Sequence, residues 1–219
     1  VGFSYRDPVD KIIDATRKLV CPGFINTHVH PHANAGDYFR NDPGKKDYFG
    51  SNYLTYLTPK KGAKRPPDLE DFRESGKFGL VQAIKNGSTT IVIYGGGAEG
   101  EDDFVTMVGE LGVRAYLAPS FRNVDFYYEG TGALRYVWDD AAGEKGLQQA
   151  VTFIQKHRGS YNGLIQGMLF PRQPDTCSPE LLKKTRNAAR ELGVGIQIHA
   201  AMNLIEFHEI LMKYGKTPI

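Results

Sequence analysis

The sequence has little cysteine, no long apolar run and almost no excess of charge. Cys21 and Cys177 are the only cysteines among 219 residues. Two are too few for a disulfide framework, which makes a reducing cytoplasm the expected compartment. No stretch approaches the ~18 consecutive apolar residues of a membrane-spanning helix. Lysine and arginine number 27 against 25 acidic residues, a formal net charge of +2, whereas a dedicated nucleic-acid binder shows a concentrated basic excess.

The residues that are present have the composition of a globular protein. Hydrophobic residues make up 41% and charged residues 24% of the chain, which is typical of a folded domain rather than a disordered segment. At about 150 residues per domain, the length suggests one large domain or two small ones. The chain begins at Val1 without an initiator methionine, which suggests a fragment or a processed start.

Apolar runs and helical patterns alternate along most of the chain. Runs of β-branched and apolar residues predict five strands, and amphipathic spacing with terminal glycines predicts the helices. The expected strands are Phe24–His30, Thr89–Tyr94, Val113–Ala118, Leu164–Leu169 and Val194–His199. The expected helices are Asp68–Lys85, Asp103–Leu111, Glu144–His157, Pro179–Glu191 and Met202–Tyr214. This alternation indicates parallel βα units, which either close into a barrel or form an open sheet.

Two long stretches interrupt the alternation. Pro31–Pro67 is much longer than a usual βα connection and is rich in tyrosine and lysine. Such a stretch is interpreted either as a lid or pocket wall over a substrate, or as a solvated insertion. Pro119–Gly143, which includes Arg122 and Trp138, is expected to be irregular and is open to the same two interpretations.

Three histidines occupy positions suited to a metal ion. His28 and His30 are two residues apart on an expected strand, so both side chains point to the same face. Two imidazoles on one face can begin a zinc or iron site, although such a pair also occurs as two structural histidines. His199 ends the last expected strand, where (β/α)-barrel enzymes place their chemistry. The other histidines lie in a loop or in expected helices and fit surface or packing roles.

Four segments carry a family resemblance. Leu19–His30, with the sequence LVCPGFINTHVH, resembles the first-strand signature PGFxxxHxH of the amidohydrolase superfamily. Gly87–Thr90 resembles its G-x-T-T second strand, and Glu110–Ala115 resembles the stretch that enters its third strand. Thr176–Ile219 is similar to the fifth-strand region of the aminohydrolase and chlorohydrolase branch. That branch includes guanine, cytosine and S-adenosylhomocysteine deaminases and triazine hydrolases.

The resemblance implies an α/β fold, a (β/α)8 TIM-type barrel of which this chain holds about the first five βα units. Residues 1–20 would be a remnant of a flanking β-sandwich, and residues 21–219 a partial hydrolase barrel. The family's sixth-strand histidine and eighth-strand aspartate would fall beyond Ile219. Because a complete barrel takes about 250 residues, we expect association with the missing barrel half, or a homo-oligomer.

The resemblance also implies a metal site. The family's ligands correspond to His28, His30 and His199, which would hold one divalent metal ion, usually zinc or iron. A metal-activated water would then attack a carbon of a small-molecule substrate that bears an amino, amide or halide group. Gln197 and Arg122 are expected to be substrate-binding residues of the pocket. The fourth expected strand has no lysine where dinuclear members carry a carboxylated one, which favours a single metal.

Met202 departs from the pattern of the deaminase branch. There, a proton-shuttling glutamate follows the fifth-strand histidine by three residues; here Met202 occupies that position, while Glu206 matches a later glutamate of the pattern. A thioether cannot transfer protons at neutral pH. One interpretation is a hydrolase of a non-peptide carbon–nitrogen bond whose eighth-strand aspartate does all the proton work, or whose chemistry is not a deamination. The other is a catalytically inactive fragment or pseudoenzyme with a binding or assembly role.

Overall fold

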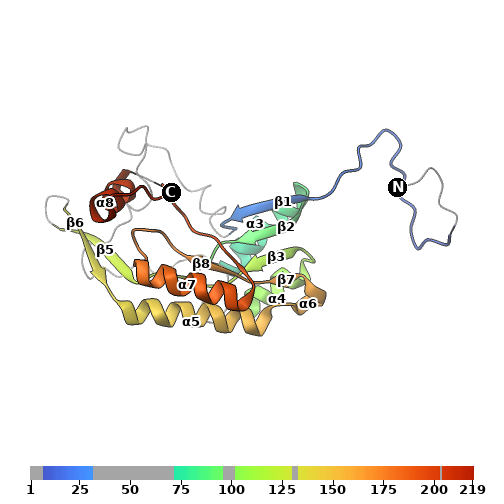
Figure 1. Ribbon diagram of the computed structural model, residues 1–219. Coiled ribbons are helices and arrows are strands. Elements are labelled where there is room, and N and C mark those ends of the chain that lie inside the picture. The colour runs from blue at the N-terminus through green and yellow to red at the C-terminus, as the bar shows by residue number, and fades with distance from the viewer. Residues whose placement is uncertain (1–6, 32–71, 96–101, 130–132, 203) are drawn as a thin grey trace.

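A parallel β-sheet flanked by helices forms the centre of the protein (Figure 1). The computed structural model describes residues 7–31, 72–95, 102–129, 133–202 and 204–219. The sequence therefore predicted the α/β class correctly. Pro31–Pro67, apart from Pro31 itself, lies outside the described residues. Residues 7–20 form no strand and extend away from the sheets in Figure 1.

The parallel strands form two sheets that continue one another. The first sheet has the order β1-β2-β3-β7, and the second has the order β4-β8-β9. The bounds are β1 Phe24–Val29, β2 Ser88–Ile93, β3 Arg114–Leu117, β4 Ser120–Phe121, β7 Ile165–Gln166, β8 Met168–Pro171 and β9 Gly195–Ile196. Because β4 continues β3 and β8 continues β7, each strand pairs with a neighbour in chain order. That is the order in which the strands of a (β/α) barrel follow one another.

Helices cover this sheet and bury two apolar cores. The long helices are α3 Phe72–Lys85, α4 Asp102–Glu110, α5 Asp140–His157, α7 Pro179–Leu192 and α8 Leu204–Tyr214, and α6 Ser160–Gly163 is a single turn. One core joins β2, β4 and β8 to α5 and α7 around Phe170, which is fully buried. The other core joins β2, β3 and β7 to α3 and α4 around Ile91. Among the described residues, no helix combines the length and the apolar character that a membrane crossing requires.

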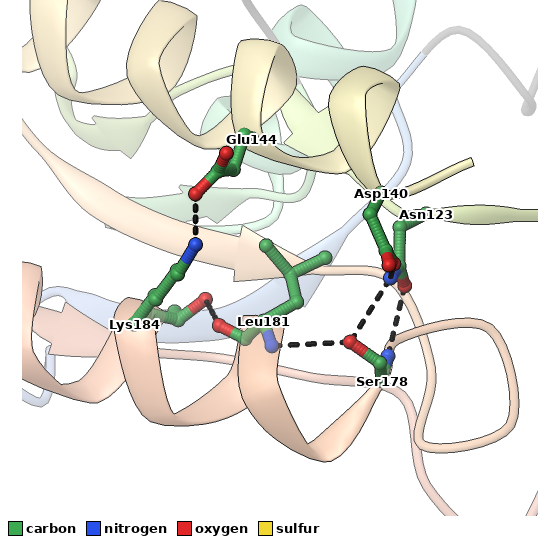
Figure 2. A network of polar contacts seen from close by, with 7 residues as sticks. Asn123, Asp140, Glu144, Ser178, Leu181 and Lys184 are labelled. Atoms are coloured by element: carbon green, nitrogen blue, oxygen red, sulfur yellow. Dashed lines mark hydrogen bonds and ion pairs between the residues drawn. The ribbon is translucent and has the colours of Figure 1, made fainter. Parts of the chain in front are cut away.

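Local signals explain where α5 and α7 begin. The side chains of Asp139 and Ser178 accept hydrogen bonds from the backbone N–H groups of Ala142 and Leu181, as N-caps do. Asn123 lies 2% exposed between the two helix starts. Figure 2 shows its amide donating to Asp140 (2.7 Å) and to the Ser178 hydroxyl (2.9 Å), while its oxygen accepts from the Ser178 N–H (2.8 Å). The N-termini of α5 and α7 are therefore joined by one buried side chain.

The expectation that Pro119–Gly143 is irregular was wrong. This stretch holds β4, an antiparallel hairpin of β5 Val124–Glu129 and β6 Ala133–Trp138, and the start of α5. The physical reason is that valine, tyrosine and phenylalanine in these segments favour extended backbone. Helix α5 also begins at Asp140 rather than at Glu144, because Asp139 supplies the N-cap.

Two of the expected strands differ in detail. The fourth is interrupted at Gly167 and ends at Pro171 instead of Leu169. A Cβ at Gly167 would lie 2.5 Å from Ile154 of α5, so the backbone approaches the helix closely there. The fifth shortens to Gly195–Ile196, although Gln197 and His199 still donate backbone hydrogen bonds to Leu169 and Arg172. This extension carries His199 to the edge where the first two histidines lie.

Candidate metal centre

His28, His30 and His199 meet at the carboxyl ends of the strands. His28 lies in β1, His30 follows the end of β1, and His199 comes three residues after β9. Their Nε2 atoms are separated by 3.0 Å between His28 and His30, and by 3.1 Å in each of the other two pairs. Among the described residues, this trio is the one group of three or more potential metal ligands.

The three nitrogens fit a metal ion better than they fit one another. A neutral imidazole nitrogen either donates or accepts a hydrogen bond, so three mutually adjacent nitrogens cannot satisfy all three pairs. A triangle with 3.0–3.1 Å sides has its centre about 1.8 Å from each corner, so a point slightly above that centre allows three zinc–nitrogen bonds of ~2.0–2.1 Å. The donor set therefore suits a divalent cation such as zinc.

Gln197 orients the ring of His28. Its Nε2 donates to the Thr27 carbonyl (2.6 Å), which turns its Oε1 toward Nδ1 of His28 (2.9 Å). Because that oxygen can only accept, Nδ1 carries the proton and Nε2 keeps its lone pair. Metal-binding histidines commonly have such a partner on their second nitrogen. The structure thus brings Gln197, which the sequence assigned to the pocket, into contact with a predicted ligand.

His199 is held by the backbone and is neutral at physiological pH. Its N–H donates to the carbonyl of Arg172 (3.3 Å). Burial, with the neighbouring His28 and the Arg172 charge, lowers the pKa of His199 to about 4, against a hydrogen bond to the Arg172 backbone. A histidine must be neutral to bind a metal, so this environment suits a ligand.

Tyr94 forms the buried floor under the three histidines, and the sequence reasoning missed it. Its ring centroid lies 4.0 Å from that of His199, 5.3 Å from that of His30 and 5.4 Å from that of His28. The hydroxyl donates to the carbonyls of Pro171 (3.2 Å) and Arg172 (3.0 Å). Its burial raises the pKa of the phenol, so Tyr94 stays a hydrogen-bond donor. Its place directly after β2, next to the end of β1, was the available signal.

Arg122 lies at the end of β4, beside a cavity of about 230 Å³. Its guanidinium forms an ion pair with Asp125. The cavity is lined by Ser120, Phe121, Arg122, Ala142, Gly146 and Arg172. Arg122 is therefore a cavity residue, and its neighbour there is a second arginine.

Met202 lies in the turn that follows His199, and Glu206 lies in the first turn of α8. The Met202 sulfur accepts a hydrogen bond from Nε2 of the buried Gln173 (3.3 Å). The Glu206 carboxylate is fully buried and accepts from the backbone N–H groups of Ala201 and Met202, at 2.9 Å each. Glu206 thus fixes the turn before α8, in which Ala201 has a φ of 54°.

Comparison with known proteins identifies the family of this chain. The model of the amidohydrolase family matches residues 19–218. The chain belongs to the amidohydrolase family. It is 32% identical over 210 residues to a 5-methylthioadenosine/S-adenosylhomocysteine deaminase of Carboxydothermus hydrogenoformans, covering 95% of this chain and 43% of that protein. It is 26% identical to a 5'-deoxyadenosine deaminase of Methanosarcina mazei, covering 100% of this chain and 45% of that protein.

Solved structures that resemble this amidohydrolase family member support the fold. A zinc-bound adenosine deaminase from Xanthomonas campestris superposes with a TM-score of 0.61 at 16% identity, over 90% of this chain and 40% of that one. A triazine hydrolase variant superposes with a TM-score of 0.60 at 20% identity, over 90% and 44% of the two chains. The chain spans less than half the length of the curated relatives named above.

Proposed function

We propose that this chain carries the metal-binding part of a hydrolase that cleaves a carbon–nitrogen bond, other than a peptide bond, in a small molecule. The observation that carries the proposal is the triangle of three Nε2 atoms from His28, His30 and His199. Similar proteins are named as deaminases, which supports a carbon–nitrogen bond as the one that is cleaved. The chain order of the five strands supports a partial (β/α)8 barrel, to which a flanking β-sandwich segment and further strands would belong.

The residues of this chain have distinct roles in the proposed reaction. His28, His30 and His199 would hold one divalent ion, zinc or iron, whose chemistry when bound is to lower the pKa of a water toward ~7 and so supply a nucleophile. Gln197 fixes the protonated nitrogen of His28. Tyr94 excludes water beneath the three rings and holds the carbonyl that binds the His199 N–H. Arg122 is proposed to contact the substrate from the cavity.

A single metal ion is part of the proposal. The segments β7 and β8 contain no lysine that could bridge a second ion. Metal analysis of the full-length protein should therefore give about one tightly bound equivalent per chain. Two equivalents that withstand dialysis would contradict the proposed site.

A second candidate is a binding or assembly role without hydrolysis. Met202 favours this role, because it occupies the position of a glutamate in the deaminases that the sequence resembles. Its sulfur cannot transfer protons at neutral pH. In this case the three histidines would still bind a metal, but no hydrolysis would follow.

Ammonia release from adenosine, 5'-deoxyadenosine and guanine by the metal-loaded, full-length protein separates the two candidates. We expect metal-dependent release that is lost in His199→Asn. The matched control is His208→Asn, because His208 is exposed on α8. A protein that binds one metal but hydrolyses none of these amines, nor halogenated or amide analogues, would support the binding role instead.

A further inference from the structure

Arg122 and Arg172 follow adjacent parallel strands in register. Ser120 pairs with Phe170 and Phe121 pairs with Pro171, so the next residue on each strand is an arginine. The Arg172 N–H donates to the Phe121 carbonyl (2.9 Å), which continues the pairing to that point. Equivalent positions on neighbouring strands place their side chains on the same face. The two arginines therefore follow paired strands on the same face, and both residues line the same cavity.

Two like charges at neighbouring positions are unfavourable without a compensating anion. The Asp125 carboxylate offsets the charge of Arg122, and it is 75% exposed. Among the described residues, no carboxylate forms an ion pair with Arg172. The Arg172 charge thus has no carboxylate partner in the described part of the chain, and Arg172 lines a cavity at the carboxyl ends of parallel strands, where barrel enzymes bind their ligands.

The size and the lining residues of the cavity suit an anion site. Its volume is about 230 Å³, below the ~300–1,000 Å³ of pockets that enclose a whole drug-sized ligand. This size suits one substituent of a larger molecule. Arginine presents a planar fork of donors that matches carboxylate and phosphate oxygens. Ser120 adds a hydroxyl to the lining.

Arg172 connects this cavity to the metal centre. Its carbonyl accepts from both the His199 N–H and the Tyr94 hydroxyl. On the other side, a Cβ at Gly95, the residue after Tyr94, would lie 3.2 Å from the Ser120 hydroxyl. The two sites are therefore neighbours along one edge of the sheet.

We propose that Arg122 and Arg172 form an anion site that takes a carboxylate or phosphate group of the ligand, while the reacting end of that ligand lies at the three histidines. The second part rests on the proposed function, whereas the anion site itself stands on the paired arginines and the cavity. The site would select substrates that carry a negative charge at one end, over neutral molecules with the same reactive group.

Calorimetric titration of metal-free, full-length protein with inorganic phosphate, and separately with acetate, tests the anion site without any hydrolysis. We expect one of the two anions to saturate a single site per chain. Loss of a charged hydrogen-bond donor should weaken this binding about tenfold or more in Arg172→Gln and in Arg122→Gln. Arg172→Lys should bind with intermediate affinity, because it keeps the charge and loses the fork.

Arg186→Gln is the matched control, since Arg186 is exposed on α7 and does not line the cavity. It should bind phosphate and acetate as the unaltered protein does. Two results would overturn the proposal: no binding of either anion, or binding that Arg172→Gln and Arg122→Gln leave unchanged. Folding of each variant is checked by circular dichroism, and the two single substitutions serve as replicates of one another.

Kinetics of the metal-loaded protein test the link to the substrate. A nucleoside, its 5'-monophosphate and its 5'-carboxylate share one amino group and differ only in the anion. We expect one anionic form to have the higher kcat/KM, and Arg172→Gln to remove that advantage through KM. Equal kcat/KM values for all three would refute the selection of anionic substrates. No turnover of any of them, with phosphate or acetate still bound, would refute the proposed hydrolysis and leave the anion site intact.

Discussion

Tyr94 supports the three histidines through both its ring and its hydroxyl. Tyr94→Phe keeps the ring but removes the hydrogen bonds to the carbonyls of Pro171 and Arg172. Loss of residues that orient metal ligands typically costs 10–100-fold in metal affinity, so we expect about a tenfold loss of zinc affinity. Competition with a chromophoric chelator measures this change.

Tyr161→Phe is the control for that substitution, because Tyr161 is exposed in α6 and lies away from the metal centre. It should leave zinc affinity unaltered. Tyr94→Leu, which also removes the ring, should weaken zinc binding further than Tyr94→Phe does. Equal affinity in Tyr94→Phe and in the unaltered protein would show that the hydroxyl has no part in positioning the ligands.

Asp175 is a buried carboxyl group that we expect to destabilise the folded protein at neutral pH. Burial and the nearby Glu206 charge together raise the pKa of Asp175 to about 6, while the Tyr136 hydroxyl opposes the change. Among the described residues, its Oδ1 has no hydrogen-bond partner. Because the pKa is higher in the folded state than in the unfolded state, the folded protein binds the extra proton. Folding stability is therefore greatest below pH 4 for this group, and it falls as the pH rises to about 6.

Asp175→Asn removes that charge while preserving the shape of the side chain. We expect it to raise the free energy of unfolding at pH 7.5 by up to about 3 kcal/mol, the equivalent of a shift of two pKa units. At pH 4 the difference from the unaltered protein should be small, since Asp175 is then protonated in the folded state. Urea unfolding at the two pH values measures both differences, and equal differences would contradict the assigned cause.

Helices α5 and α7 are linked in two ways that differ in burial (Figure 2). Asn123 is buried and makes three hydrogen bonds to the helix starts. Lys184 and Glu144 form an ion pair whose side chains are 55% and 59% exposed. Unsatisfied buried polar groups cost about 1–3 kcal/mol each, whereas exposed ion pairs contribute about 0–1 kcal/mol.

Asn123→Ala should therefore lower the free energy of unfolding by about 2–3 kcal/mol, because it removes three half-buried hydrogen bonds that each contribute about 0.5–1.5 kcal/mol. Lys184→Ala, the control on the same pair of helices, should lower it by about 1 kcal/mol or less. Chemical denaturation of both variants gives the comparison. Equal losses would mean that Asn123 is no more important than the exposed ion pair.

The elements that were predictable from sequence are those with strong local signals. The β-branched run of β2 and the Ser178-Pro179 start of α7 needed no tertiary information. The hairpin β5–β6 was missed, since loop-like composition around it outweighed its strand-forming residues. The break at Gly167 depends on the approach of α5 and leaves no local signal. The features that the sequence did not predict depend on tertiary contacts.

The convergence of the three histidines was predictable for a related reason. His28 and His30 share a strand face, and strand ends converge in a parallel sheet. The partners of these histidines were not predictable in the same way. Gln197 was assigned to the pocket, and it contacts His28. Tyr94 was not considered at all. Contacts of side chains across strands depend on the register of the strands, which the sequence alone does not give. The pairing of Arg122 with Arg172 depends on the same register.

At the scale of the whole molecule, the three histidines join the two ends of the sheet. His28 lies in β1, His30 directly follows it, and His199 follows β9, so the sequence separation between the first two and the third is about 170 residues. In the described part of the chain, β1 pairs only with β2, and β9 only with β8. A metal bound by all three would tie these outer strands together.

Metal removal should therefore lower the stability of the folded protein. A ligand that binds only the folded state stabilises it by about 4 kcal/mol when its concentration is 1,000 times its Kd. We expect the thermal midpoint of the metal-loaded, full-length protein to fall by several degrees on chelation and to return on addition of zinc. In His199→Asn the midpoint should no longer respond to zinc, whereas in His208→Asn it should respond as in the unaltered protein. A midpoint insensitive to zinc in the unaltered protein would mean that the trio does not tie β1 to the end of β9, because cross-linking of strands so far apart in the chain cannot leave unfolding unchanged.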